Sequence, residues 1–409
     1  MSTSILSKRW CNLWHLRRNL NFNVPSVFGS EEKLRGRDIK GKFVERIDQF
    51  VKNFKGTKID SFMVELYHLR SVESTNIDQW TKFAISKGVE RIVLVGPWYA
   101  HRDVYRARDC VSCDEFPFGL SFECNNSTLK YVHLKFFHVR NPTNFDPFPF
   151  KKLRSLVIEE STVDVKLLTT LLSNCRLLEE LSFIECLFNS TTLQIESSSL
   201  CHFKLDQCQE FNTNADEVDI ELTSLDCLKL TSLYYHIRNN SSISLFNAPL
   251  PIVMKSSINA PKLKTIYHDE VFSVEKLHRA FTHFATFPKL EILNLYIFSY
   301  PRPRMRYPDP VYCNHEIQKD IQDVMSLSHD EIKVIELRGC VGHWYEIEFA
   351  LNALKYIHKL ERIVLNPYWI HNWSERDWEF NPTWYQIGRE RILKKLQDEG
   401  IELDKLVLR

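Results

Sequence analysis

The sequence predicts an α/β solenoid, in which short parallel strands form one curved sheet and helices or irregular segments return on its convex side. Two observations predict this fold. One hydrophobic phrase recurs along the chain, and apolar residues at helical spacing precede several of its copies. In each copy a leucine or similar residue is followed by two residues, a hydrophobe, one residue and a second hydrophobe. The last two hydrophobes of a strand should point to the core, and the residues between them outward.

Twelve copies of the phrase lie between residue 59 and residue 408. Eight are clear: Leu129, Val132, Leu134; Leu153, Leu156, Ile158; Leu178, Leu181, Phe183; Leu200, Phe203, Leu205; Leu225, Leu228, Leu230; Leu290, Leu293, Leu295; Leu360, Ile363, Leu365; and Leu403, Leu406, Leu408. Four are weaker: Ile59, Phe62, Val64; Val89, Ile92, Leu94; Leu263, Ile266; and Ile332, Ile335, Leu337. One short strand and one return segment per unit is the signature of leucine-rich repeats.

Several return segments are expected to be helices because their apolar residues recur every three or four positions. The sets are Val44, Ile47, Val51, Phe54; Ile77, Trp80, Ala84; Val165, Leu168, Leu172, Cys175; Ile347, Leu351, Leu354, Ile357; and Ile392, Leu393, Leu396. Gly56 and Gly400 are plausible ends for the first and last of these helices. No unit could bury its apolar face alone, so stability must come from neighbouring units.

Four parts are predicted along the chain. Residues 1–24 should hold a basic, tryptophan-containing amphipathic helix or helix pair over residues 3–20, and residues 25–58 a linker with an amphipathic helix. Residues 59–328 should hold the repeats, with long insertions at 98–127, 234–261 and 300–328, and residues 329–409 the terminal repeats and a cap. The aromatic stretch from Tyr368 to Tyr385 is either this cap or an exposed binding patch.

The outward residues of the strands form the predicted binding face. They are Tyr131, His133, Lys135, Glu159, Glu180, His202, Lys204, Asp206, Tyr296 and Arg338. Because charged, aromatic and small residues are mixed there, the face suits a protein or a small ligand better than a polyanion.

Composition excludes several functional classes. The 409 residues carry 53 basic and 52 acidic side chains, a net charge of +1, which gives little attraction to nucleic acid or anionic membrane. No apolar run approaches the roughly 18 residues that span a bilayer, and no secretory signal opens the chain. We therefore expect an intracellular protein, in nucleus or cytoplasm, with neither nucleic acid nor membrane as partner.

The eleven cysteines are expected to be free thiols, because their number is odd and three of them recur at one repeat position. Cys186, Cys208 and Cys340 each stand eight residues after the first hydrophobe of a copy, where a small side chain can turn into the core. The pair Cys110 and Cys113, with His101 and Cys124 nearby, offers a weak alternative, a zinc site. Since only one tight pair occurs, we expect no metal and no cofactor.

Catalysis is not expected. The sequence contains no glycine-rich phosphate loop, no nucleophile elbow and no paired-histidine zinc motif. The run His268, Asp269, Glu270 is interpreted as a solvated charged turn. An enzyme with a cleft in the insertion loops stays the alternative.

Three segments resemble plant proteins. Residues Thr3–Trp14, Thr-Ser-Ile-Leu-Ser-Lys-Arg-Trp-Cys-Asn-Leu-Trp, are similar to the closing phrase of the F-box in plant F-box proteins with leucine-rich repeats. Residues 332–340, 346–352 and 360–365 resemble the FBD region that ends many of them. Residues 77–92 resemble the first repeat after their F-box.

The resemblance implies a substrate receptor of an SCF-type ubiquitin ligase. The F-box would dock on the adaptor subunit, and through it on the cullin, while the repeats hold a protein substrate. Adaptor contacts would fall on Ile5, Leu6, Trp10 and Trp14. Because only the closing helix of an F-box precedes the repeats here, Trp10 and Trp14 are expected to pack on the first repeat rather than dock. The alternative is a free-standing repeat protein that binds a partner or small ligand without any ligase.

Overall fold

The computed structural model describes residues 17–28, 38–66, 74–97, 128–140, 150–211, 220–236, 257–270, 287–297, 329–340, 342, 344–372, 377–380 and 388–409. The chain divides into two compact units, Met1–Ser224 and Leu225–Arg409. None of the helices within these ranges is long and apolar enough to cross a bilayer. Several predicted features lie outside the described residues: Ile5, Leu6, Trp10, Trp14, His101, Cys110, Cys113, Cys124 and most of the three insertions.

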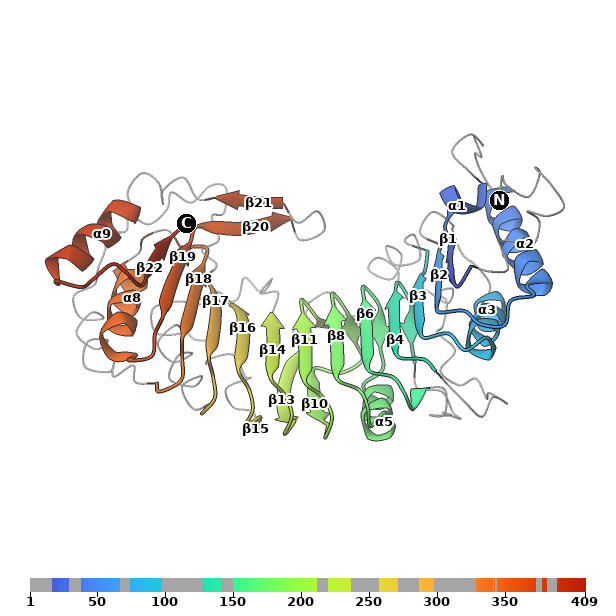
Figure 1. Ribbon diagram of the computed structural model, residues 1–409, viewed down its shortest axis with the longest axis horizontal. Coiled ribbons are helices and arrows are strands. Elements are labelled where there is room, and N and C mark those ends of the chain that lie inside the picture. Colours follow the sequence, from blue (N-terminus) through green and yellow to red (C-terminus); the bar gives the residue numbers. More distant parts are fainter. Residues whose placement is uncertain are drawn as a thin grey trace. The chain divides into compact units, whose positions relative to one another are not determined.

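Parallel strands run side by side through the first unit (Figure 1). Their order is β1 (Asn19–Phe22), β2 (Ser61–Glu65), β3 (Arg91–Val95), β4 (Tyr131–Lys135), β6 (Ser155–Glu159), β8 (Glu180–Ile184) and β11 (His202–Asp206). The register aligns the two inward positions of each phrase, so that Val132 lies beside Leu156 and Leu134 beside Ile158. All four side chains are buried, which makes these rows the core of the unit.

One turn follows the strands β4, β6, β8 and β11. Its first residue has a left-handed backbone, with φ between 43° and 62°, although none of the four is glycine: Phe136, Glu160, Glu185 and Gln207. The next residue points into the core, and at two of these positions it is a buried free thiol, Cys186 or Cys208. The turn then leads into short parallel strands, β5 (His138–Val139), β7 (Thr162–Val163), β9 (Leu187–Phe188) and β12 (Gln209–Glu210). The prediction of buried cysteines at this position is confirmed.

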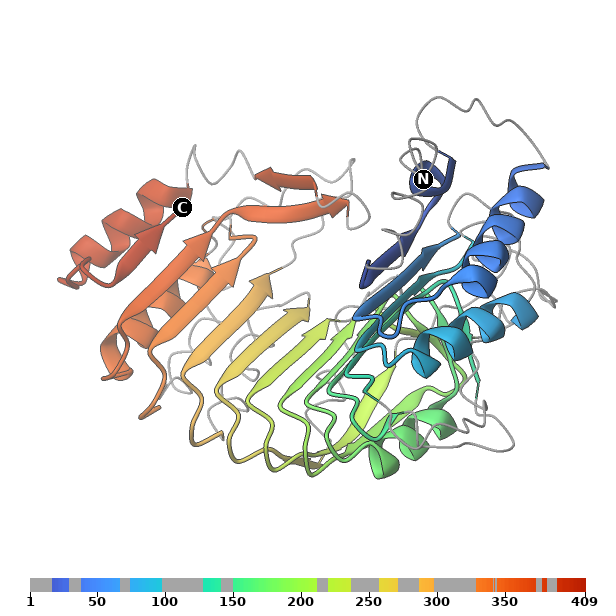
Figure 2. The ribbon, with the colours of Figure 1, turned by 45° about the vertical axis from the view of Figure 1, so that its right-hand side comes forward.

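Helices cover the core side of the first unit. They are α1 (Val24–Phe28), α2 (Asp38–Asn53), α3 (Ser74–Ser86) and α5 (Val165–Asn174). Helices α2 and α3 lie side by side (Figure 2), and Trp80 Nε1 of α3 donates a 2.7 Å hydrogen bond to Asp48 Oδ1 of α2. Asp164 caps the N-terminus of α5, and its carboxylate accepts a 2.9 Å hydrogen bond from the Lys166 amide. Strand β10 (Thr192–Glu196) follows α5 in the chain and packs against it.

The second unit repeats the plan. Its parallel strands are β14 (Ser232–His236), β16 (Thr265–Glu270), β17 (Ile292–Ile297), β18 (Val334–Arg338), β19 (Arg362–Asn366) and β22 (Leu406–Leu408). Its helices are α8 (Trp344–Tyr356) and α9 (Arg389–Asp398). The remaining strands are β13 (Glu221–Asp226), which crosses the boundary between the units, β15 (Ser257–Asn259), and the antiparallel pair β20 (Tyr368–Asn372) and β21 (Asp377–Phe380). The five helices predicted in return segments are confirmed, and the parallel strands of each unit confirm an α/β repeat fold.

The end of the predicted N-terminal helix is wrong. Residues 19–22 form strand β1, which pairs in parallel with β2, and its Leu20 and Phe22 are buried. The hydrophobic phrase did not predict this strand, because Arg17 occupies the position at which every other copy begins with a hydrophobe. The predicted domain limits at residues 24, 58 and 328 stay predictions.

The copy predicted at Leu225, Leu228 and Leu230 is wrong in its register. The strand is β14, and the phrase that it carries starts at Leu230 and continues through Leu233 and Tyr235, all buried. Leu228 is 53% exposed. The leucines in residues 225–230 match the spacing by coincidence, because Leu225 belongs to the preceding strand, β13, which ends at Asp226.

The run His268, Asp269, Glu270 is also wrong as a turn. All three residues belong to β16, and their backbone pairs with Leu295, Tyr296 and Ile297 of β17. A polar residue at an inward position of the phrase does not end the strand, since neighbouring strands on both sides hold the backbone in register. The choice between cap and patch for Tyr368–Tyr385 stays untested, because the described part of that stretch is limited to the backbone of β20 and β21.

A close glycine contact fixes the approach of α9 to the turn after β18. Gly342 has φ +82°, and a Cβ placed there would overlap the backbone of Gly388, which precedes α9. The Gly342 amide donates a 2.8 Å hydrogen bond to Glu346 Oε2 in the first turn of α8. Both the backbone angle and the lack of space therefore require glycine here.

The register of β14 predicts opposite outcomes for two leucines. Leu230→Ala should lower the free energy of unfolding by about 2–5 kcal/mol, because it leaves a cavity in the core. Leu228→Ala should change it by less than about 0.5 kcal/mol, because that side chain faces solvent. Urea unfolding of both variants measures the difference. Equal losses would contradict the register.

The glycine contact predicts that Gly342→Ala lowers the free energy of unfolding by at least about 2 kcal/mol, from backbone strain and overlap with Gly388. The matched control is Gly41→Ala. Gly41 lies exposed in α2, and a Cβ added there would meet nothing within 4 Å, so alanine should stabilise by about 0.5–1 kcal/mol. Thermal unfolding checks both signs. An unchanged Gly342→Ala protein would show that the contact is not required.

Candidate partner-binding face

The outward face of the first unit, defined by three rows of side chains on β3 to β11, brings eight predicted residues together. The rows are Arg91, Tyr131, Ser155, Glu180, His202; Val93, His133, Val157, Ser182, Lys204; and Val95, Lys135, Glu159, Ile184, Asp206. They arise because successive residues of a strand point to opposite faces, and the inward positions are taken by the core. Every strand therefore presents three residues outward, in register with its neighbours.

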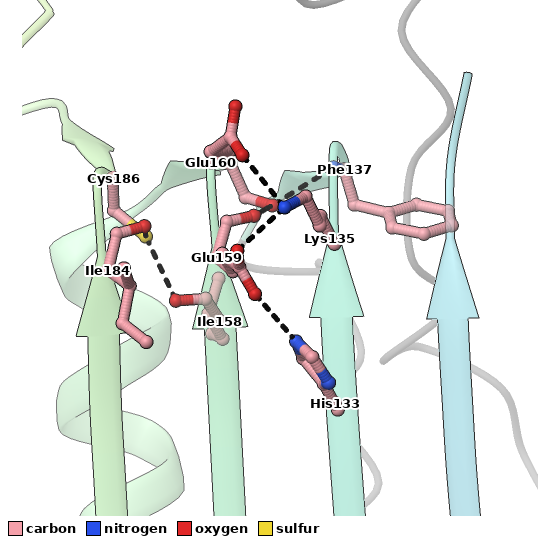
Figure 3. A network of polar contacts seen from close by, with 9 residues as sticks. His133, Lys135, Phe137, Ile158, Glu159, Glu160, Ile184 and Cys186 are labelled. Carbon is pink, nitrogen blue, oxygen red and sulfur yellow. Dashed lines mark hydrogen bonds and ion pairs between the residues drawn. The ribbon is translucent and has the colours of Figure 1, made fainter. Parts of the chain in front are cut away.

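The centre of the outward face is a polar network around Glu159 (Figure 3). Its Oε1 atom accepts a hydrogen bond from Lys135 Nζ at 2.6 Å, and its Oε2 atom lies 3.2 Å from His133 Nε2. Lys135 also makes a 2.8 Å ion pair with Glu160, the left-handed residue of the turn after β6. The Glu159 carboxylate thus joins two neighbouring strands, β4 and β6. The turn after β6 brings a second carboxylate, that of Glu160, to Lys135.

The network changes the acidity of its members. The hydrogen bond from His133 is the largest cause that lowers the pKa of Glu159, to about 2; Lys135 lowers it further, and burial opposes both. For Lys135, burial alone would lower the pKa, but the hydrogen bonds to Glu159 and Glu160 outweigh it and the pKa is raised. Both side chains are about one quarter exposed, so these charges are held in place at the surface.

Around the network lie charged and apolar groups of different exposure. The Arg91 guanidinium sits 3.8 Å from the centre of the Tyr131 ring, a cation–π contact. Lys204 pairs with Asp206 at 2.8 Å, and the Asp206 side chain is only 9% exposed in spite of its outward position. Glu180 and His202 are exposed. The face therefore carries both signs of charge.

Sequence reasoning missed two residues of this face, Arg91 and Glu160. Arg91 lies in the weaker copy that starts at Val89, and Glu160 stands in the turn, so neither was expected beside the binding residues. The Ser155 hydroxyl is buried and makes no hydrogen bond among the described residues. Aligning the parallel strands in register would have found Arg91, which lies beside Tyr131. The left-handed turn that brings Glu160 to Lys135 has no signal in the sequence.

The other two predicted residues belong to the second unit. Tyr296 lies on β17, where only its backbone is described. Arg338 lies on β18, half-buried, with its Nε atom 3.1 Å from Glu336 Oε1.

The described residues offer little for covalent or metal chemistry. Within those ranges no group of three or more histidine, cysteine or acidic side chains could hold a metal ion. Burial raises the pKa of Cys175 to about 12 and raises those of Cys208 and Cys340 as well, which makes these thiols poor nucleophiles. The geometry is suited to recognition by shape and fixed charge.

Comparisons with known proteins point to one group. Residues 77–266 match a family model described as FBD-associated F-box protein At5g56370, LRR repeats. The chain is 29% identical over 187 residues to the F-box/FBD/LRR-repeat protein At4g00160 of Arabidopsis thaliana, covering 45% of this chain and 36% of the relative. It is 25% identical over 258 residues to a putative FBD-associated F-box protein, At5g22720, of the same plant, covering 60% of this chain and 49% of the relative.

A third relative, the FBD-associated F-box protein At3g52670 of Arabidopsis thaliana, is 29% identical over 202 residues, covering 49% of this chain and 42% of the relative. The chain thus spans less than half the length of each of these three relatives. None of the three names denotes an enzyme. The resemblance drawn from the sequence is confirmed: this chain is similar to plant F-box proteins that carry leucine-rich repeats and an FBD region.

Proposed function

We propose that this chain is a non-catalytic protein-binding module, a leucine-rich-repeat solenoid that captures a protein substrate for an SCF-type ubiquitin ligase inside the cell. The observation that carries the proposal is the outward face of the first unit, in a chain whose relatives are F-box proteins. Such a receptor performs no reaction. It raises the concentration of its substrate near the ligase, an effective-concentration effect.

The chemistry of the outward face favours a protein as occupant. Glu159, Glu160 and Glu180 lie among its lysines and histidines, so a polyanion would meet repulsion at several points. Val157 and Ile184, half-buried between the charges, supply apolar area, and Tyr131 with Arg91 supplies the residue types enriched in protein interfaces. A protein surface with charges of both signs is complementary to this mixture.

The face is ordered before any partner arrives. Lys135 and Glu159 already hold each other, so binding would cost little side-chain entropy for these two residues. Fixed pairs of opposite charge favour one orientation of the partner over others. We therefore assign recognition to His133, Lys135, Glu159 and their neighbours on this face.

Adaptor binding tests the ligase part of the proposal. If the F-box phrase serves a ligase, purified adaptor and cullin should co-purify with the chain, and the double variant Trp10→Ala, Trp14→Ala should reduce adaptor capture by about tenfold or more, since these tryptophans are its large apolar groups. Adaptor capture that the double variant leaves unchanged would agree instead with the expectation that both tryptophans pack on the first repeat. The matched control is Glu180→Lys with His202→Glu, which alters exposed residues of the outward face and should leave adaptor capture unchanged. Capture of a protein partner without any adaptor binding would favour the free-standing alternative.

Glu159→Gln tests the ordering of the face. The pKa of Glu159 is about 2, against an ordinary value of 4.5, so its carboxylate stabilises the fold above pH 4.5, and this contribution is lost as pH falls toward 2. At pH 7 the variant should lose about 1–3 kcal/mol of unfolding free energy, and its stability should vary less than that of the wild type between pH 5 and pH 3. Urea unfolding across this range measures both, with Glu180→Gln as the exposed control. Parallel pH profiles for Glu159→Gln and wild type would contradict the network.

A further inference from the structure

The second unit has an outward row that the sequence did not single out. Tyr234, Tyr267, Asn294 and Glu336 stand in register on β14, β16, β17 and β18. We call these four residues the Tyr–Asn row. They occupy the middle outward position of their strands, as His133 does in the first unit.

Asn294 has an unused hydrogen-bond donor. The residue is only 7% exposed, and its Nδ2 atom is buried without any hydrogen bond among the described residues. Buried donors are almost always paired, because leaving one unpaired costs free energy in the folded state. An outward position on a sheet gives no packing reason to prefer asparagine over an apolar residue.

The adjacent acceptor is already occupied. Glu336 is the register neighbour of Asn294, but its Oε1 atom accepts from Arg338 Nε at 3.1 Å and from Asn366 Nδ2 at 3.2 Å. Arg338 Nη2 reaches the other oxygen at 3.4 Å. The carboxylate is thus directed along its own strand and toward β19, and the Asn294 amide is left for an external acceptor.

On the other side of Asn294 lies a pair of aromatic rings. The Tyr234 and Tyr267 rings are 5.8 Å apart, tilted by 34°, and both residues are half-buried. Ile292 and Val334, the first residues of β17 and β18, lie side by side and are half-buried as well. Two tyrosines beside aliphatic side chains form the kind of amphipathic surface that anchors a partner side chain.

These groups together define the ligand. It must bring a hydrogen-bond acceptor to Asn294 and an apolar group to the tyrosines, and it cannot be strongly anionic, because the Glu336 carboxylate adjoins the donor. An extended polypeptide meets all three conditions. Its backbone carbonyl accepts from Nδ2, its next amide can donate to the asparagine oxygen, and its side chains alternate in direction.

We propose that the Tyr–Asn row binds an extended segment of the partner protein, with a backbone carbonyl on Asn294 Nδ2 and an apolar side chain against Tyr234 and Tyr267. This rests on the proposed function, capture of a protein, and adds a second, sequence-reading site to it. The partner's apolar side chain against the two tyrosines gives specificity. The hydrogen bond from the Asn294 amide to the partner's carbonyl gives affinity.

The experiment uses a phage-displayed library of random linear peptides, selected on the full chain without adaptor or cullin. Selected peptides, measured by fluorescence anisotropy, should bind Asn294→Leu and Tyr267→Ala at least about tenfold more weakly than the wild type. Tyr267→Phe, which keeps the ring, should retain binding. Glu402→Gln, at an exposed residue of the second unit between α9 and β22, is the control and should bind as the wild type does. Hydrogen exchange with peptide bound should slow in β16 to β18.

The stability of Asn294→Leu gives an independent readout. Removal of an unpaired buried amide should leave Tm unchanged or raise it by a few degrees, even as peptide binding is lost. A lower Tm would mean that Asn294 has a structural partner, and would overturn the proposal. Equal peptide affinity of wild type and Asn294→Leu would overturn it too, as would displacement of the peptides by single-stranded RNA or by neutral oligosaccharide. Since no ligase subunit is present, loss of adaptor binding cannot produce any of these results.

Discussion

Every strand of these sheets depends on its neighbours to cover two hydrophobic side chains. In the first unit the inward pair of one strand, such as Val132 and Leu134, is flanked in register by the inward pairs of the next strands on either side. Burying one such side chain contributes about 1.5–3 kcal/mol, whereas fixing the backbone of each residue costs about 1–2 kcal/mol. A strand with two inward residues and three outward ones cannot offset that cost alone. The register between strands is therefore the constraint on which the structure depends.

The same constraint creates the outward face. Once the inward positions are fixed, the three remaining residues of each strand must stand beside their equivalents on the next strand, whatever their chemistry. Lys135 is placed beside Glu159 by register alone, and the left-handed turn after β6 then adds Glu160. The charged network of the first unit is thus a consequence of the packing of leucines on the opposite side of the sheet. Its composition can change without disturbing the core.

The parts of the fold that follow from the hydrophobic phrase could be predicted from the sequence, and those that depend on exceptions to it could not. Eleven of the twelve copies lie on strands of the sheets in the expected register, because two buried positions with one residue between them specify a strand face. Strand β1 was missed since Arg17 replaces the leading hydrophobe, and β14 was misplaced since Leu225, Leu228 and Leu230 imitate the phrase. The spacing of apolar residues cannot distinguish a buried leucine from an exposed one when both stand at positions that the repeated phrase allows.

Charge pairs between repeats were also missed, although their residues share one position. The residue after the leading hydrophobe is Asp60, Glu90 or Lys130 in successive copies of the first unit, and Lys130 Nζ lies 2.9 Å from Glu90 Oε2. In the second unit Glu291 stands at the same position between Lys264 and Lys333, at 2.9 and 3.2 Å. Such exposed pairs contribute little stability each, but they disfavour a shifted register, which would bring like charges together.

On the outward faces, the free energy that a polar atom costs the folded protein depends on whether the atom has a hydrogen-bond partner. A charged pair such as Lys135 and Glu159 satisfies itself, and the protein is stable with the face empty. The buried Ser155 hydroxyl and the Asn294 amide have no partner among the described residues, so the free protein bears a cost there that packing does not explain. Residues selected for stability alone would be apolar at both positions. A buried polar atom without a partner therefore distinguishes a surface that contacts another molecule from a surface that only faces solvent. The periodicity of apolar residues in the sequence does not reveal this difference.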